Sequence, residues 1–147
     1  GLSFLYARFY ETIFEENSIV CEFTHNEDFI LSCSQSDFSD SILNIIENSI
    51  HALVNNKNKE DRYILINFSN KVLSIKDSAD GVEEDVLSKI YEPYFTTKHQ
   101  SFGVGLGLFT VHEFFVRNLN FKIEFKNEEF EYKNKKLKGL NININFN

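Results

Sequence analysis

The spacing of hydrophobic residues along this chain predicts helices and strands in alternation. Residues 2–15 carry hydrophobic side chains at helical spacing, with Leu5, Phe9 and Ile13 on one side. The two runs that follow, SIVCEFT and FILSCS, have the composition of short strands on either side of the turn-like HNED. We therefore expect a helix and then two strands at the start of the chain.

A longer helix is predicted next, from about residue 37 to residue 54, with Ser36 or Asp37 as its N-cap. Its hydrophobic positions recur at helical spacing and define one buried face, made of Ile42, Ile45, Ile46, Ile50 and Leu53. The runs RYILINFS and KVLSIKD then predict a hairpin that turns around Ser69 and Asn70.

The second half of the chain predicts two further helices and a set of strands. A short helix is expected in EEDVLSKI, and LGLFTVHEFFVRN is helical after a glycine-rich segment. Three C-terminal runs, FKIEFKN, EFEYKN and LNININFN, alternate like antiparallel strands. Helices and hairpins in this order predict an α+β fold, with helices on one face of a mixed, mostly antiparallel sheet.

The composition is that of one globular domain. The chain has 147 residues, 42% of them hydrophobic and 16 of them Phe, which is enough to bury a single core. Its formal net charge of −7 argues against broad binding of nucleic acid or of a membrane surface, while a local pocket could still bind phosphate. Cys21 and Cys33 lack metal-ligand spacing. With no signal peptide and no membrane-spanning run, we expect reduced thiols and a cytoplasmic location, which leaves a membrane-anchored parent protein open.

A polar stripe runs along the long helix. At about 100° per residue, Asn44, Asn48 and His51 fall on the side opposite the hydrophobic face. A solvated face is the ordinary interpretation of such a stripe. Asn, however, is roughly 0.6 kcal/mol worse than Ala inside a helix, and Glu or Lys would serve a solvated face better. The side-chain carbonyl of Asn can instead ligate a hard cation such as Mg²⁺.

Three segments after the hairpin contain further candidate chemistry. Asp77 stands at a probable strand end before a turn at Gly81, where an Asx-type turn is the commoner interpretation and a carboxylate that recognises adenine is the functional one. Lys98 follows in YEPYFTTKHQ, which by itself would be an ordinary loop. In GVGLGL, alternating glycines precede a helix and would let backbone N–H groups approach a phosphate. The spacing fits neither a Walker A loop nor a dinucleotide fingerprint.

Taken in order, these segments resemble the ATP-binding catalytic domain of sensor histidine kinases, within the gyrase, chaperone, histidine kinase and mismatch-repair ATPase superfamily. LNIIENSIHAL resembles the N box, DSADGV the first glycine box, YEPYFTTK the F box and GVGLGL the second glycine box. The F box and the short lid are most similar to the nitrogen-regulation type. The resemblance implies a two-layer α/β sandwich, the Bergerat fold, over residues 18–147, with a binding site for ATP and Mg²⁺.

The resemblance also assigns roles to single residues. Asn48 matches the Asn that holds Mg²⁺, with Asn44 and His51 on the same face, and Asp77 matches the carboxylate that binds adenine. The remaining matches line the nucleotide pocket, at Gly81, Ile90, Phe95, Gly103, Gly105, Leu106, Gly107 and Leu108. Lys98 is expected to orient the γ-phosphate.

Two departures from the family pattern stand out. Ala79 replaces the first glycine of the first glycine box, which would cost about 1 kcal/mol if that position needs a positive φ. The phosphoacceptor motif is absent around His25, His51, His99 and His112. We therefore expect a fragment whose residues 1–17 end a missing dimerisation region. The expected partners are that phosphoacceptor domain, in a homodimeric parent, and a response regulator, with no nucleic acid and no direct membrane contact.

Hydrolysing members of the superfamily place a Glu four residues before the metal-binding Asn, where it activates water. Here that position is Asn44, and Glu47 lies about 100° from Asn48 around the helix. Loss of a general base typically costs 10²–10⁴-fold, so we expect a kinase that transfers the γ-phosphoryl group to a histidine. The alternative is a regulatory nucleotide-binding module without efficient transfer, which Ala79 favours. An independent ATPase would be revealed by rapid phosphate release.

Overall fold

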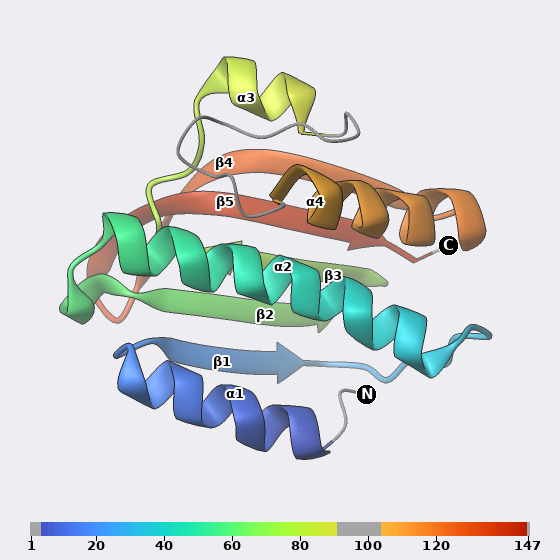
Figure 1. The fold of residues 1–147 in the computed structure, drawn as a ribbon, viewed down its shortest axis with the longest axis horizontal. Helices are drawn as coiled ribbons and strands as arrows, with labels where there is room; N and C mark the ends of the chain where they lie inside the picture. Colours follow the sequence, from blue (N-terminus) through green and yellow to red (C-terminus); the bar gives the residue numbers. More distant parts are fainter. Residues whose placement is uncertain (1–3, 91–103, 147) are drawn as a thin grey trace.

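The computed structural model describes residues 4–90 and 104–146, with side chains described from residue 10 to residue 90 and from residue 108 to residue 146. Figure 1 shows the helices in front of one sheet. In chain order the elements are α1 (Phe4–Glu16), β1 (Val20–His25), α2 (Gln35–Asn56), η1 (Lys59–Asp61), β2 (Tyr63–Ser69), β3 (Val72–Asp77), α3 (Glu84–Lys89), α4 (Val104–His112), the π-helical η2 (Glu113–Asn118), β4 (Lys122–Tyr132) and β5 (Lys135–Asn145).

The sheet has five strands in the order β1-β2-β3-β5-β4. β1 runs parallel to β2, and the chain crosses between them through α2. The other neighbours are antiparallel, so that Ile75 in β3 stands opposite Ile66 in β2 and Ile142 in β5. This architecture confirms the predicted α+β class and the mixed, mostly antiparallel sheet.

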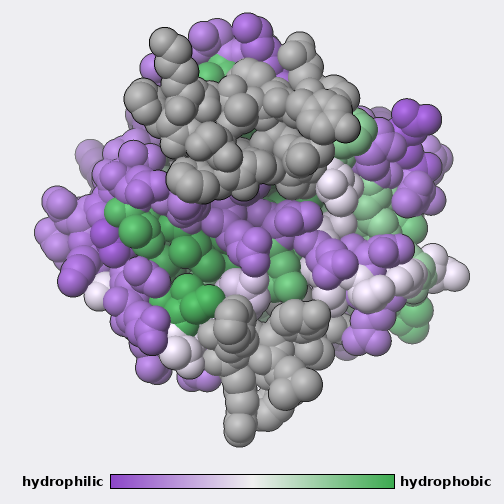
Figure 2. All heavy atoms as spheres, in the orientation of Figure 1, coloured by the Kyte–Doolittle hydropathy of each residue, from purple (hydrophilic) through white to green (hydrophobic). Residues whose placement is uncertain are grey.

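The core lies between one face of the sheet and the helices. Strand side chains alternate across the sheet, so one face is hydrophobic and the other is polar. Ile64, Ile75 and Ile144 on the inner face have at most 1% of their surface exposed. They belong to one cluster with residues of α1, α2, α4 and η2. Figure 2 shows hydrophilic residues over much of the outer surface of the helix layer, with hydrophobic patches between them.

The long helix is as predicted, but its N-cap is not. α2 begins at Gln35, and the Ser34 hydroxyl accepts a hydrogen bond from the backbone N–H of Asp37 at 3.3 Å. The prediction of Ser36 or Asp37 as N-cap is therefore wrong by two or three residues. Asp37 instead lies in the first turn, where its negative charge complements the helix dipole.

FILSCS, predicted as a strand, has no strand structure. Because β1 pairs in parallel with β2, the chain must cross the sheet after β1, and this segment leads into α2 instead of forming a hairpin. Its hydrophobic character serves packing: the Phe29 ring lies 4.6 Å from that of Phe68 and 5.0 Å from that of Phe146, between ring centroids.

The remaining local predictions are largely confirmed. The β2–β3 hairpin turns at Asn70 and Lys71, whose φ angles are 53° and 62°. FKIEFKN and EFEYKN, predicted as two strands, form the single strand β4, because its pairing with β5 continues without a break from Lys122 to Tyr132. The predicted helix after the glycines is formed by α4 and η2, and the N–H of Leu119 donates to the carbonyl of Phe114, five residues earlier.

None of the described helices combines the length and the apolar character needed to cross a membrane.

In α1, Tyr10 is buried in the core and its hydroxyl donates to Glu47 of α2 at 2.6 Å. The boundary predicted at residue 17 stays a prediction.

The contact between η2 and α2 should carry much of the stability of the helix layer. Phe115 is fully buried and meets the Phe38 ring edge to face, with 5.9 Å between centroids. We predict that Phe115→Ala lowers the free energy of unfolding by about 3–5 kcal/mol, measured by denaturant titration. The matched control, Phe23→Ala, removes a ring that is 56% exposed and should cost about 1 kcal/mol or less. Equal losses in the two variants would contradict this account of the core.

Candidate functional site

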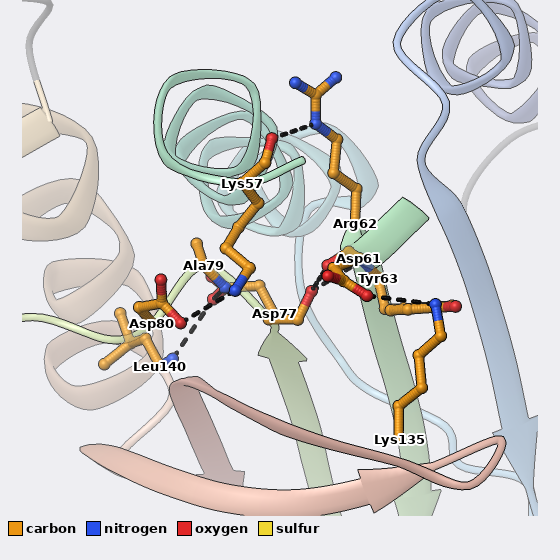
Figure 3. Close-up of polar contacts among 10 residues, drawn as sticks. Lys57, Asp61, Arg62, Tyr63, Asp77, Ala79, Asp80, Lys135 and Leu140 are labelled. Atoms are coloured by element: carbon orange, nitrogen blue, oxygen red, sulfur yellow. Dashed lines mark hydrogen bonds and ion pairs between the residues drawn. The ribbon is translucent and has the colours of Figure 1, made fainter. Parts of the chain in front are cut away.

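The site is organised around the carboxylate of Asp77 at the C-terminal end of β3. This side chain is only 4% exposed, although it is ionisable. Its Oδ1 accepts hydrogen bonds from the backbone N–H groups of Ala79 at 3.0 Å and Leu140 at 3.3 Å. Its Oδ2 accepts one from the Ser49 hydroxyl at 3.0 Å. Figure 3 shows Asp77 with Ala79 and Leu140 beside it.

Burial raises the pKa of Asp77, and the nearby charge of Asp80 adds to this, while the hydrogen bonds from Ala79, Leu140 and Ser49 lower it. Desolvation outweighs these bonds, so the pKa lies above its usual range. A carboxylate has about four acceptor positions, and the described contacts use three of them. The carboxylate can therefore accept one more N–H donor, such as an exocyclic amine.

The backbone of β5 approaches Asp77 more closely than any side chain would allow. A Cβ atom placed on Gly139 would lie 1.6 Å from the Asp77 carbonyl oxygen and 2.7 Å from its Oδ1. A glycine is therefore required at this position, and its neighbour Leu140 brings its N–H group to the carboxylate. Sequence reasoning missed Gly139 and Leu140, which only the register of β3 and β5 brings to this place.

The loop after Asp77 carries the departure from the family pattern at Ala79. Ala79 is buried and is not among the described residues with a positive φ. The positive angles fall on Asp80, at 73°, and on Gly81, at 77°. The N–H of Asp80 donates to the Lys138 carbonyl at 2.8 Å, and its carboxylate pairs with Lys57 at 3.1 Å. The backbone cost that we considered for Ala79 therefore does not arise.

The polar stripe belongs to α2, the helix that contacts this carboxylate through Ser49. Asn44, Asn48 and His51 are all half-buried, which does not fit a simply solvated face. The side-chain amide nitrogen of Asn48 is buried and has no hydrogen-bond partner among the described residues. The next residue, Ser49, is buried and contacts Asp77 directly. One helix thus presents an amide with an unused donor and a hydroxyl that fixes the carboxylate.

Ser49 is a second site residue that the sequence analysis missed. A Ser in the middle of a long helix, next to the hydrophobic face, was a detectable signal, because buried hydroxyls need a partner.

Only some of the other predicted site residues lie in the part of the chain that the structure describes. Ile90 and Leu108 are buried, at 5% and 3% exposure, in the cluster that contains the α2 core residues. α4 begins at Val104, two residues before the predicted start, so its first turn contains Gly105, Leu106 and Gly107. Predictions for Phe95, Lys98 and Gly103 lie outside the described residues.

The donor set fits Mg²⁺–ATP better than a metal held by protein alone. Among the side chains that the structure describes, no group of three His, Cys, Asp or Glu could hold a metal ion. A single Asn carbonyl can contribute one ligand to Mg²⁺, which usually takes its others from water and from substrate phosphates. The buried amide nitrogen of Asn48, which has no partner among the described residues, could donate to a phosphate oxygen, and the described contacts of Asp77 leave one acceptor position for the adenine amine.

Comparisons with known proteins agree with this geometry. Residues 34–145 match the family described as histidine kinase-, DNA gyrase B-, and HSP90-like ATPase. Sensor kinase CckA of Brucella abortus is 49% identical over 41 residues, which are 28% of this chain and 4% of that protein. Sporulation kinase A of Bacillus subtilis is 28% identical over 97 residues, 65% of this chain and 16% of that protein. The chain therefore spans a small part of the length of these relatives.

Solved structures share the fold. The catalytic domain of histidine kinase ThkA, in a nucleotide-free form, superposes with a TM-score of 0.69 and 23% identity over 93% of this chain and 85% of that chain. The mycobacterial sensor histidine kinase MprB gives a TM-score of 0.68 and 16% identity over 94% of this chain and 91% of that chain. The chain belongs to the family of histidine kinase-, DNA gyrase B- and HSP90-like ATPases, and the two solved structures named here that share its fold are histidine kinases.

Proposed function

We propose that this domain binds Mg²⁺–ATP and passes the γ-phosphoryl group to a histidine on a dimerisation domain of the same protein. In the transfer, the bond between the γ-phosphorus and the β–γ bridging oxygen breaks, a phosphorus–nitrogen bond to the imidazole forms, and ADP leaves. The observation that carries the proposal is the buried carboxylate of Asp77. It accepts a hydrogen bond from Ser49, the residue that follows Asn48 on α2.

The chain's own residues orient the nucleotide. Asp77 would accept a hydrogen bond from the adenine amino group, and Ser49 keeps the carboxylate in place for it. The side-chain carbonyl of Asn48 would hold Mg²⁺, and when bound this ion neutralises charge on the phosphates. Lys98 and the segment from Gly103 to Gly107 are proposed to contact the phosphates, and Phe95 the adenosine. Catalysis of this kind needs positioning more than a reactive side chain.

The position of Glu47 supports transfer over hydrolysis. A hydrolase needs a base that activates water beside the γ-phosphate. Glu47 is exposed, and its Oε1 accepts the Tyr10 hydroxyl hydrogen bond at 2.6 Å, which directs it towards α1. Asn44, at the position of the base in hydrolysing relatives, has an amide that cannot take up a proton at neutral pH. Both observations argue against efficient attack by water.

The wider arrangement belongs to the same proposal. We propose a cytoplasmic catalytic domain in a homodimeric parent of the nitrogen-regulation type, with residues 1–17 next to the dimerisation region and a response regulator as the final acceptor. A regulatory module without efficient transfer is the second candidate. Its only support was Ala79, and the backbone angles at Asp80 and Gly81 remove that support.

Replacing Asp77 with Asn separates binding from folding. The Asn side chain has the same shape, its oxygen can accept from Ala79 and Leu140, and its nitrogen can donate to Ser49. We predict that Asp77→Asn weakens binding of Mg²⁺–ADP about 10- to 100-fold in calorimetry, because the charged acceptor for the adenine amine is lost. The control Asp28→Asn changes an exposed carboxylate and should bind as the wild type does. Unchanged ADP affinity in Asp77→Asn would contradict the assignment.

The same variant should be the more stable one at neutral pH without nucleotide. Because the folded pKa of Asp77 is raised, its ionised form is disfavoured in the folded state, and stability is lost as pH rises from the unfolded pKa to the folded pKa. We predict that Asp77→Asn unfolds at a higher denaturant concentration than the wild type at pH 7. The difference should shrink as pH falls towards about 4, the value for an unfolded Asp. A variant less stable than the wild type at pH 7 would contradict the dominance of desolvation.

The metal assignment has its own variant. We predict that Asn48→Ala abolishes the Mg²⁺-dependent part of ADP binding, measured by titration with Mg²⁺ and with EDTA, because the amide ligand is lost. Asn55→Ala, an exposed Asn in the last turns of the same helix, provides the control for the change in helix propensity. If Mg²⁺ strengthens ADP binding equally in Asn48→Ala and the wild type, Asn48 is not the metal ligand.

A further inference from the structure

The loop that follows Asp77 is held from the side by the β4–β5 hairpin. Three neighbouring residues of β5 contact it: the Lys138 carbonyl accepts from Asp80, Gly139 packs on the Asp77 backbone, and Leu140 donates to the Asp77 carboxylate. The hairpin begins at Lys122, after α4 and η2. It helps to fix the position of the loop, together with Tyr63 of β2, which exchanges hydrogen bonds with Ser78.

A further contact with the loop comes from Asn127 on β4. Its Oδ1 accepts the backbone N–H of Val82 at 2.9 Å, and its Nδ2 donates to the backbone carbonyl of Val82 at 2.6 Å. One side-chain amide thus pairs with both polar groups of one residue, as a neighbouring strand would do. Asn127 stands directly opposite Leu140 in the β4–β5 register, so it acts on the far side of the same loop as the Asp77 contact.

Asn127 also lies against Gly81, one of the two loop residues with a positive φ angle. A Cβ atom placed on Gly81 would lie 2.4 Å from Asn127 Oδ1 and 2.9 Å from its Cγ. The Gly81 backbone is therefore enclosed by Asn127 on one side. The loop cannot shift towards β4, and the two hydrogen bonds to Val82 stop it from moving away.

We infer that Asn127 is a positioning residue for recognition of the nucleotide base, because it clamps the Val82 backbone and thereby holds Gly81 and Asp77 in their binding positions. The inference rests on the proposed function, in which Asp77 accepts the adenine amine and Gly81 packs beside the base. Asn127 acts through the loop and needs no contact with the nucleotide.

The clamp needs both a donor and an acceptor. Asp at this position would keep the acceptor for the Val82 N–H but would place a second oxygen against the Val82 carbonyl, where Nδ2 now donates. Glu84, whose Oε1 lies 3.5 Å from Nδ2, would add repulsion against the new carboxylate.

The first test is binding of Mg²⁺–ADP and Mg²⁺–GDP to Asn127→Ala in calorimetry. We expect ADP affinity to fall about ten-fold, because two hydrogen bonds that order the loop are lost. GDP affinity should change less, so the preference for adenine should fall. Asn143→Ala, a half-buried Asn on β5 of the same hairpin, is the matched control and should bind both nucleotides as the wild type does.

The second test remains usable if Asn127→Ala fails to fold. Asn127→Asp keeps the acceptor for the Val82 N–H and loses the donor to the Val82 carbonyl, so we expect its ADP affinity at pH 7 to fall at least several-fold.

The outcomes separate the two claims. If the wild type binds ADP and a folded Asn127→Ala or Asn127→Asp variant binds it equally well, the inference is overturned while the proposed function stands. If the wild type binds neither nucleotide, the proposed function fails, and the inference fails with it.

Discussion

The burial of one carboxylate sets the requirements that the rest of this site meets. Asp77 is 4% exposed, and desolvation of its charge is opposed by donors from three parts of the chain, namely Ser49 on α2, Ala79 in the following loop and Leu140 on β5. A buried charge is costly unless it is hydrogen-bonded. The helix, the loop and the hairpin must therefore all be in place before the carboxylate can be accommodated, which couples the fold to the site.

The helix α2 joins the two ends of the proposed nucleotide site. Its hydrophobic face packs on the sheet, and Ser49, the residue after Asn48, contacts Asp77. A helix turns by about 100° per residue, so neighbouring residues point in clearly different directions. Ser49 can therefore fix the acceptor for the base while Asn48 stays available for the metal ion. The helix is rigid, and this rigidity would transmit a fixed spacing between base and phosphates.

Local patterns predicted the helices, the β2–β3 hairpin and the motifs around Asn48 and Asp77, because periodicity and turn chemistry are properties of neighbouring residues. They could not predict that FILSCS is a loop between β1 and α2, since this depends on β1 pairing in parallel with β2. The same limit hid Gly139 and Asn127, which reach the site only through strand register. The place of Ala79 in the first glycine box suggested that this residue needs a positive φ angle. The structure instead has the positive φ angles at Asp80 and Gly81.

The most direct test of the account is a calorimetric titration of the wild-type chain with ADP and with GDP, each in the presence and absence of Mg²⁺. An acceptor carboxylate at Asp77 and a metal ligand at Asn48 together predict binding that prefers adenine over guanine and that Mg²⁺ strengthens. Equal affinity for the two nucleotides, or ADP binding that Mg²⁺ leaves unchanged, would contradict the roles assigned to these two residues.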